Sequence, residues 1–388
     1  MPGIIKEASG SLEPATRSGI NETPNFTSDD QEAWAKALVP SLLRILENGK
    51  YPQDEQVDYF NWFCRWIVPA MGPSLYSDKR HKAKSIATAD GSPIEWSIKW
   101  TEKKSRPTVR FTIEPSNSKS LTPSDPLNQT EFQRLMRDMG AQIPGLGLGL
   151  FEHFVAATLV TNKELEELQT RAVPPSLPGR GAWLAFDLEA GGIGVKAYVI
   201  TAAKALSTGI SAKDIVFDTI RKWDGGQGRY DTSINLFNDY LESLSSQGDL
   251  APRVAMVAID CEDSAQARIK IYFHTHARTL VQAKAAYTLN GRLEGQVVQD
   301  ALAALSQLWQ SLFGTTDTCV FESEREPGHC MCAVEMRPGR EPETKLYLPI
   351  NNTNMTDGQV CDGLKAWFGK RGHFHIADTY QDRFCNIL

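Results

Sequence analysis

Residues 268–274 alternate between polar and apolar side chains. Successive side chains of a β-strand point to opposite faces. One face of this strand would therefore carry Arg268, Lys270, Tyr272 and His274. Two cations on a strand that is otherwise strongly apolar are costly to bury without a partner, so we expect an anionic group or water to meet this face.

A cation followed two residues later by a tyrosine recurs in residues 193–200 and 345–350. The tyrosines Tyr198, Tyr272 and Tyr347 are spaced 74 and 75 residues apart. Arg110, in residues 109–113, lies 86 residues before Lys196. It fits as an earlier member of the repeat with a less regular spacing. Each cationic strand follows another strand candidate, in residues 94–100, 183–188, 254–260 and 331–336.

A repeat of this length indicates one supersecondary unit per period. Four hairpins that each turn a cation inward predict an α+β fold, in which antiparallel strands surround a polar lumen and helices lie outside. Helical spacing and a capping-box-like start at Ser28 support this order. Helices are expected after Gly149 and over residues 28–46, 56–68, 128–139, 212–223, 230–244, 295–313 and 359–368. Residues 373–388 would supply a fifth hairpin or part of one, residues 1–27 a flexible tail, and residues 28–388 a single domain.

The composition is that of a globular protein, with 41% hydrophobic and 23% charged residues. A net charge of −6 argues against nucleic acid as a partner, because proteins that bind the phosphate backbone carry a basic surface. No apolar run is long enough to span a membrane, and the N-terminus is too polar for a signal peptide. The seven scattered cysteines do not form a disulfide framework. We expect a cytoplasmic protein.

The cations of the hairpins form a candidate site for an anion such as a diphosphate. Charge-assisted contacts to phosphate oxygens are strong and suit both Arg and Lys. The alternative is that each cation pairs with a neighbouring carboxylate on the wall of the barrel. We favour an anion site, because the pattern repeats in register over several hairpins. The candidate residues are Arg110, Lys196, Arg268, Lys270 and Lys345.

The tyrosines and Glu95 add chemistry to this face. Aromatic rings attract a nearby cation, so Tyr198, Tyr272 and Tyr347 would suit an allylic diphosphate, whose ionisation leaves a carbocation. Glu95, on the polar face of the first strand, is placed to act as a general base or hydrogen-bond acceptor. The alternatives are core tyrosines with satisfied hydroxyls and a salt bridge from Glu95 to Arg110.

Other motifs carry less. No Asp-Asp-x-x-Asp cluster is present to hold diphosphate through magnesium, so binding would be by side-chain cations directly. The glycine-rich residues 145–149 lack the Lys-Ser/Thr of a phosphate loop. The pairs His274 and His276, His373 and His375, and Cys330 and Cys332 lack further ligands in view, so no metal site is expected.

Taken together, these segments resemble the fungal aromatic prenyltransferases of the dimethylallyltryptophan synthase type, from about residue 30 to the C-terminus. The resemblance rests on the set, in this order, of Gly91-Ser92-Pro93-Ile94-Glu95, Arg110, Lys196-Ala197-Tyr198, Arg268-Ile269-Lys270-Ile271-Tyr272 and Lys345-Leu346-Tyr347-Leu348-Pro349. It implies an αββα (ABBA) barrel of ten antiparallel strands inside a ring of helices.

The resemblance also implies roles. The five cations would bind the diphosphate of dimethylallyl diphosphate, the tyrosines with Tyr380 would shield the carbocation, and Glu95 would accept a hydrogen bond from an indole N–H. No cofactor is implied, and magnesium is not required for the chemistry. Trp183 stands where tryptophan-prenylating relatives often carry a lysine, Lys345 where many have glutamine, and Phe384 where a second tyrosine is common. Trp183 and Arg253 are candidates for binding the acceptor.

We therefore expect metal-independent Friedel–Crafts transfer of a dimethylallyl group to an indole in secondary metabolism. The alternatives are a phenolic or polyketide acceptor, or a non-catalytic barrel that binds a phosphorylated ligand. The only partners expected are a prenyl diphosphate, a small aromatic molecule and a second copy of the chain in a homodimer. The sequence leaves open the ring position attacked, the mode of attachment and the length of the donor, for which Cys330 and Met331 are candidate determinants.

Overall fold

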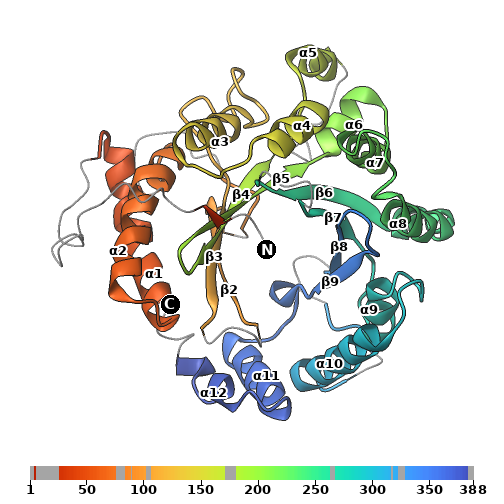
Figure 1. The fold of residues 1–388 in the computed structure, drawn as a ribbon. Coiled ribbons are helices and arrows are strands. Elements are labelled where there is room, and N and C mark those ends of the chain that lie inside the picture. The colour runs from red at the N-terminus through yellow and green to blue at the C-terminus, as the bar shows by residue number, and fades with distance from the viewer. Residues whose placement is uncertain are drawn as a thin grey trace. The chain divides into compact units, whose positions relative to one another are not determined.

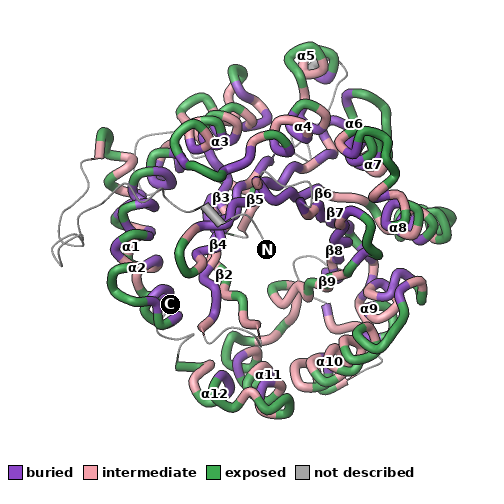
Figure 2. Tube along the Cα trace, in the orientation of Figure 1, coloured by how far each residue is buried: buried purple, intermediate pink, exposed green. Residues whose placement is uncertain are grey.

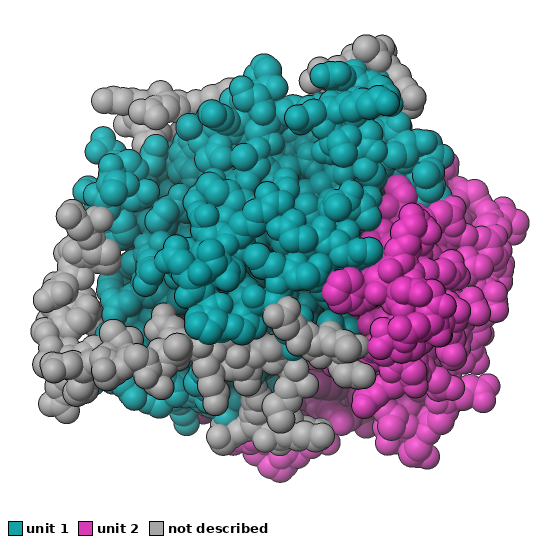
Figure 3. Space-filling model, turned by 45° about the horizontal axis from the view of Figure 1, so that its top comes forward, with its two compact units in different colours: residues 1–211, 257–268, 387 teal, residues 212–256, 269–386, 388 magenta. Residues whose placement is uncertain are grey.

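The computed structural model describes residues 4–5, 26–75, 84–88, 90–101, 106–170, 181–262, 267–315, 318–321 and 328–382. The chain divides into two compact units, which Figure 3 shows in different colours. The first unit comprises residues 1–211, 257–268 and 387, and the second comprises residues 212–256, 269–386 and 388. Strand β6 (Arg253–Asp260) therefore contributes its first half to the second unit and its second half to the first.

Antiparallel strands form the sheet of the first unit, and neighbours in this sheet follow the order of the sequence. They are β2 (Ile94–Lys99), β3 (Thr108–Ile113), β4 (Ala182–Glu189) and β5 (Gly192–Ile200). After β6, the Cys261 N–H donates to the Val195 carbonyl at 2.9 Å. Within the predicted tail, Ile4–Ile5 pair with β5 as strand β1, while residues 6–25 lie outside the described residues.

Helices lie along one face of this sheet (Figures 1 and 2). Aromatic side chains form the contact between the helices and the sheet. The rings of Phe63 and Trp96 stack at 6.0 Å, and those of Phe111 and Phe186 meet at 5.1 Å. As predicted, the first helix is capped by Ser28, whose Oγ accepts from the Gln31 N–H at 3.3 Å. The helices of this unit are α1 (Asp29–Asn48), α2 (Gln53–Trp62), a π-helical turn (Phe63–Ile67), a 3₁₀ turn (Val68–Ala70), α3 (Thr130–Gln142), α4 (Gly149–Thr158), α5 (Asn162–Thr170) and α6 (Ala202–Thr208).

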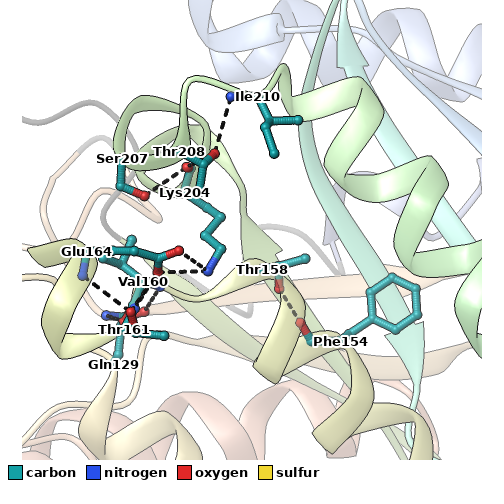
Figure 4. A network of polar contacts seen from close by, with 10 residues as sticks. All are labelled: Gln129, Phe154, Thr158, Val160, Thr161, Glu164, Lys204, Ser207, Thr208 and Ile210. Atoms are coloured by element: carbon teal, nitrogen blue, oxygen red, sulfur yellow. Dashed lines mark hydrogen bonds and ion pairs between the residues drawn. The ribbon is translucent and has the colours of Figure 1, made fainter.

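Two buried polar contacts fix helices in the first unit. The Tyr51 hydroxyl donates to the Leu188 carbonyl at 2.6 Å and accepts from the Val109 N–H at 2.8 Å, which ties the start of α2 to β3 and β4. Figure 4 shows the second contact, in which Lys204 Nζ of α6 lies 2.7 Å from both carboxylate oxygens of Glu164 in α5. Glu164 in turn accepts from the Thr161 N–H at 2.8 Å, so one carboxylate both caps α5 and joins it to α6.

The second unit repeats the order of helices followed by a hairpin (Figure 1). Strands β7, β8 and β9 are antiparallel neighbours in that order. Phe273 of β7 packs on Phe237 of α8 at 4.9 Å. The elements are α7 (Ala212–Trp223), α8 (Asp231–Ser243), a 3₁₀ segment (Ser245–Leu250), β7 (Ile269–His274), α9 (Leu280–Tyr287), α10 (Gln296–Phe313), β8 (Met331–Met336), β9 (Glu343–Tyr347), a 3₁₀ turn (Ile350–Asn352), α11 (Asp357–Lys370) and α12 (Phe374–Ala377).

The predicted helices and the eight strands of the four hairpins are confirmed, with shifts of a few residues at most ends. The count of ten strands is wrong, because the described residues hold nine, the ninth being β1. Residues 373–382 do not form a strand. Ile376 and Ala377 are buried and Tyr380 packs on Phe368 of α11, a spacing of three to four residues that is typical of a helix. Within the described residues, every helix is too short or too polar to span a bilayer.

Candidate active site

The predicted site residues of the first unit lie on the sheet face opposite the aromatic core. Trp96, Phe111 and Phe186 turn toward the helices, and alternation turns their neighbours in sequence the other way. The register places Arg110 opposite Asp187 and Ala185 opposite Lys196. We call the following set the first cluster: Glu95, Arg110, Asp187, Lys196, Tyr198, Asp260 and Arg268.

Asp187 joins two cations of the first cluster. Its Oδ1 accepts a hydrogen bond from Arg110 Nε at 2.7 Å, and its Oδ2 lies 2.5 Å from Lys196 Nζ. The side chains of Asp187 and Lys196 are each only 3% exposed. Burial raises the pKa of Asp187, but Lys196 and Arg110 outweigh it and hold that pKa at about 2.

The same burial lowers the pKa of the Lys196 ammonium, and Arg110 lowers it further, while Asp187 and Asp260 oppose the shift. A negatively charged ligand next to Lys196 would favour its charged form. Binding of an anion and protonation of Lys196 should therefore favour each other.

Arg268 is held by a carboxylate of its own. Its Nε donates to Asp260 Oδ2 at 3.0 Å and its Nη2 to Asp260 Oδ1 at 3.1 Å. The two side chains are 11% and 5% exposed. A two-pronged contact of this kind fixes the plane of the guanidinium.

Glu95 stands on the open face of β2, where Ile94 on the other face is buried. The surrounding protein raises the pKa of the Glu95 carboxyl by desolvation, and the positive charge of Arg110 lowers it. Arg110 also makes a short ion pair with Asp187 on β4, the strand on the other side of β3 from β2. An exposed carboxylate beside a strongly positive group is suited to accept a hydrogen bond.

The second unit carries an equivalent arrangement, which we call the second cluster. Its cations share one carboxylate, Glu335, whose side chain is 5% exposed. Lys345 Nζ donates to Glu335 Oε2 at 3.1 Å, and Lys270 Nζ lies 3.9 Å from the same oxygen. Arg337 Nη2 donates to Oε1 at 3.4 Å. The second cluster consists of Lys270, Tyr272, Glu335, Arg337, Lys345 and Tyr347.

Two tyrosines of the second cluster form a pair one pleat beyond the lysines. The Tyr347 hydroxyl donates to the Tyr272 hydroxyl at 3.3 Å, and the ring centroids lie 5.6 Å apart. Tyr272 is 5% exposed and Tyr347 is 41% exposed, so one ring is part of the wall and the other is open to a ligand. Tyr198 belongs to the first cluster, opposite Trp183 in the register and 8% exposed.

Of the remaining predicted residues, Trp183 lies beside Tyr198 of the first cluster, and Arg253 and Tyr380 lie outside both clusters. Trp183 is half-buried on β4, and its Nε1 has no hydrogen-bond partner among the described residues. Arg253 begins β6 and pairs with exposed Asp249 at 2.8 Å. Tyr380 follows α12, with its ring 5.7 Å from Phe368, and so stands beside a helix instead of on the expected fifth hairpin. Phe384 lies outside the described residues.

The sequence predictions missed the carboxylates that hold these cations, namely Asp187, Asp260 and Glu335. The alternative that each cation pairs with a carboxylate is correct for all five predicted cations. Asp187 and Glu335 were visible as polar residues within strands, but pairing them with a cation requires the register between strands. In both clusters one carboxylate balances at most one of the two or three positive charges that it contacts.

The described residues contain no group of three or more His, Cys, Asp or Glu side chains arranged to hold a metal ion. Cys330 and Cys332 are buried free thiols.

Comparisons with known proteins identify the family to which the chain belongs. The model of the family described as tryptophan dimethylallyltransferase matches residues 30–383. The chain belongs to this family. Prenyltransferase iacE of Pestalotiopsis fici is 34% identical over 372 residues, which cover 93% of this chain and 84% of iacE. The 7-dimethylallyltryptophan synthase hasE of Aspergillus fumigatus is 28% identical over 360 residues, which cover 89% of this chain and 76% of hasE.

Solved structures agree with the family. NotF in complex with brevianamide F and DMSPP has a TM-score of 0.81 at 25% identity, covering 96% of this chain and 90% of NotF. AnaPT from Neosartorya fischeri has a TM-score of 0.79 at 23% identity, covering 92% of this chain and 85% of AnaPT, and shows the fold alone. This member of the dimethylallyltransferase family is a prenyltransferase of the indole type. It has the αββα fold that the sequence predicted, but strands β2–β9 follow one another in the sheet where ten strands were expected.

Proposed function

We propose that this enzyme transfers a dimethylallyl group from dimethylallyl diphosphate to an indole derived from tryptophan, by electrophilic aromatic substitution that does not depend on a metal ion. The observation that carries the proposal is the sharing of carboxylates. Asp187 contacts Arg110 and Lys196, and Glu335 contacts Lys270, Arg337 and Lys345, so each of these two carboxylates is shared by several cations.

The donor would be bound by Arg110, Lys196 and Arg268 of the first cluster and by Lys270 and Lys345 of the second. Each of these side chains already contacts a carboxylate, which reduces the further ordering needed when the diphosphate binds. Because the pKa of Lys196 is lowered by burial, an added anion would strengthen the proton's hold on it. The cations would also stabilise the charge that develops on diphosphate as the C–O bond breaks.

The tyrosines would serve the allylic cation. Tyr272 and Tyr347 present two adjoining ring systems on the same strand face as the lysines. Aromatic faces stabilise a nearby cation more strongly where water is excluded. Tyr198 would contribute in the same way from the first cluster, and Tyr380 keeps this role as a prediction only.

Glu95 would hold the acceptor by accepting a hydrogen bond from its indole N–H. This contact raises the electron density of the ring in the transition state, when the ring attacks the allylic carbon. Trp183 supplies an indole edge and an N–H donor for an acceptor, and Arg253 would reach only an acceptor that extends toward the start of β6. A chain with Trp183 in place of a lysine suits a neutral acceptor such as a cyclic dipeptide.

Two variants separate donor binding from catalysis. Glu95→Gln keeps the shape of the side chain, and we expect it to leave the dissociation constant for dimethylallyl diphosphate unchanged while kcat falls about 10²–10⁴-fold. Arg268→Ala should instead weaken donor binding, because it removes a cation that Asp260 holds in place. Binding measured by calorimetry and turnover measured by mass spectrometry test both. Wild-type turnover in Glu95→Gln would show that the assigned role is wrong.

A further inference from the structure

Glu114 is a buried acidic residue of the first unit that the proposed function does not use. It follows β3 directly and is 3% exposed. Its N–H donates to the Pro93 carbonyl at 2.8 Å, which continues the pairing of β3 with β2 by one residue. Alternation therefore puts Glu114 on the same sheet face as Thr112, about 7 Å along the strand. Thr112 is the register partner of Glu95, so Glu114 lies on the face of the first cluster.

The groups that donate to the Glu114 carboxylate among the described residues are all uncharged. The Ser85 hydroxyl donates to Oε2, and the Ile86 N–H donates to the same oxygen at 3.3 Å. Asn128 Nδ2 donates to Oε1 at 3.2 Å. Hydrogen bonds to an ionised acceptor are about twice as strong as those between neutral groups. Glu114 therefore fastens residues 84–88, which we call the covering segment, to the end of β3.

The covering segment leads into β2 and so to Glu95. The Ser85 N–H donates to the Gly91 carbonyl at 3.0 Å, and the Gly91 N–H donates to the Thr88 carbonyl at 3.2 Å. These bonds close a turn shortly before β2 begins. A carboxylate that holds Ser85 therefore also bears on the path by which the chain enters β2.

The side chain of Ile86 reaches the part of this sheet face where Trp183 lies. A Cβ added to Gly181 would lie 3.4 Å from Trp183 Nε1 and 3.5 Å from Ile86 Cδ1, so both side chains approach the same glycine. Ile86 is 44% exposed, which leaves an apolar surface open beside Trp183. Trp183 in turn lies opposite Tyr198 of the first cluster. The covering segment therefore borders the first cluster on the side of Trp183.

Resting on the proposed function, we propose that Glu114 is a positioning residue for the aromatic acceptor. By holding the covering segment, it fixes the apolar wall at Ile86 that bounds an acceptor hydrogen-bonded to Glu95. Both of its carboxylate oxygens already accept hydrogen bonds from the protein, so it acts through the covering segment and not by contact with a substrate. The cations of the first cluster contact other carboxylates, namely Asp187 and Asp260, so donor binding should not depend on Glu114.

The test measures the acceptor and the donor separately in Glu114→Gln. The glutamine amide has one oxygen, so its NH₂ group must face either the covering segment or Asn128, where it meets another donor. We expect kcat/KM for the acceptor to fall about 10–100-fold, because small displacements of a positioning group are costly. The dissociation constant for dimethylallyl diphosphate, measured by calorimetry, should stay as in the wild type. The ratio of kcat/KM for L-tryptophan to that for a tryptophan-containing cyclic dipeptide should move toward one, because a loosened wall discriminates less.

Glu131→Gln is the matched control. Glu131 is also 3% exposed and also accepts from an asparagine, Asn117 Nδ2 at 3.1 Å, but it lies on α3 and its other partner is Arg134. This variant should leave the kcat/KM values and their ratio unchanged.

Ser85→Ala removes one donor from the covering segment and should lower kcat/KM for the acceptor to a smaller degree, which decides the question if Glu114→Gln does not fold. Wild-type kcat/KM and ratio in both variants, or an equal loss in Glu131→Gln, would overturn the role of Glu114 while the proposed function stands. Donor binding weakened as much as the acceptor kcat/KM would overturn it too. No prenylated product from the wild type would overturn both proposals.

Discussion

The shared carboxylate Asp187 makes a quantitative prediction about stability. Asp187→Asn keeps the shape of the side chain but removes the charge that balances buried Lys196. A fall in the pKa of this carboxyl from 3.8 to about 2 corresponds to about 2 kcal/mol of stabilisation at neutral pH. Removing one partner of a buried ion pair costs about 3–5 kcal/mol in other proteins. We therefore expect the free energy of unfolding to fall by about 2–5 kcal/mol.

Urea denaturation at pH 7 measures this change. With an m-value of about 2–3 kcal/mol/M, the midpoint should fall by about 1–2 M. Because the folded-state pKa of Asp187 lies below the unfolded value, its contribution is complete above about pH 4 and is lost as the pH falls toward 2. The difference in the free energy of unfolding between the wild type and Asp187→Asn should therefore become smaller as the pH falls from about 4 toward 2.

Two further variants test whether the loss of stability comes from leaving a buried charge without its partner. Asp249→Asn removes the charge from an exposed ion pair with Arg253 and should leave the midpoint unchanged. The double variant Asp187→Asn with Lys196→Met removes both buried charges and should recover much of the lost stability. A midpoint of Asp187→Asn equal to that of the wild type, or a double variant less stable than Asp187→Asn alone, would refute the reasoning.

Other predictions concern the tyrosine pair and the first-unit helices. Tyr347→Ala opens the aromatic wall, so the ratio of dimethylallyl alcohol to prenylated product should rise, as measured by chromatography; an unchanged ratio would contradict a shielding role. Lys204→Met leaves the half-buried Glu164 carboxylate without its partner and should lower the thermal midpoint. Lys222→Met, which removes an exposed partner of Asp218, is the control, and an equal effect of the two would show that burial does not matter there.

Much of the fold followed from local patterns. Strands β2 and β7 alternate visibly between polar and apolar residues, and capping signals located the start of α1. The C-terminal segment was misread because His373-Phe374-His375-Ile376 alternates over four residues, whereas its burial follows helical spacing against α11. A pattern this short fits both periods, and only the packing partner decides between them.

Part of the candidate site was also predictable from local patterns. The cations and tyrosines can be recognised in the sequence as polar residues on apolar strands. Their partners do not, because the contact of Arg110 with Asp187 depends on the register between two strands that are far apart in sequence. The contacts of Glu114 needed still more, since Ser85 and Ile86 lie in a connecting segment without a regular pattern of polar and apolar residues.

The most direct measurement is an incubation of the enzyme with dimethylallyl diphosphate, or geranyl diphosphate in parallel, in the presence of EDTA. The acceptors are L-tryptophan, a tryptophan-containing cyclic dipeptide and a naphthol, and the products are read by mass spectrometry. We predict that an indole acceptor gains one dimethylallyl group with EDTA present. Transfer only to the naphthol would contradict the indole assignment. Transfer that requires added magnesium would contradict direct binding of the diphosphate by the cations.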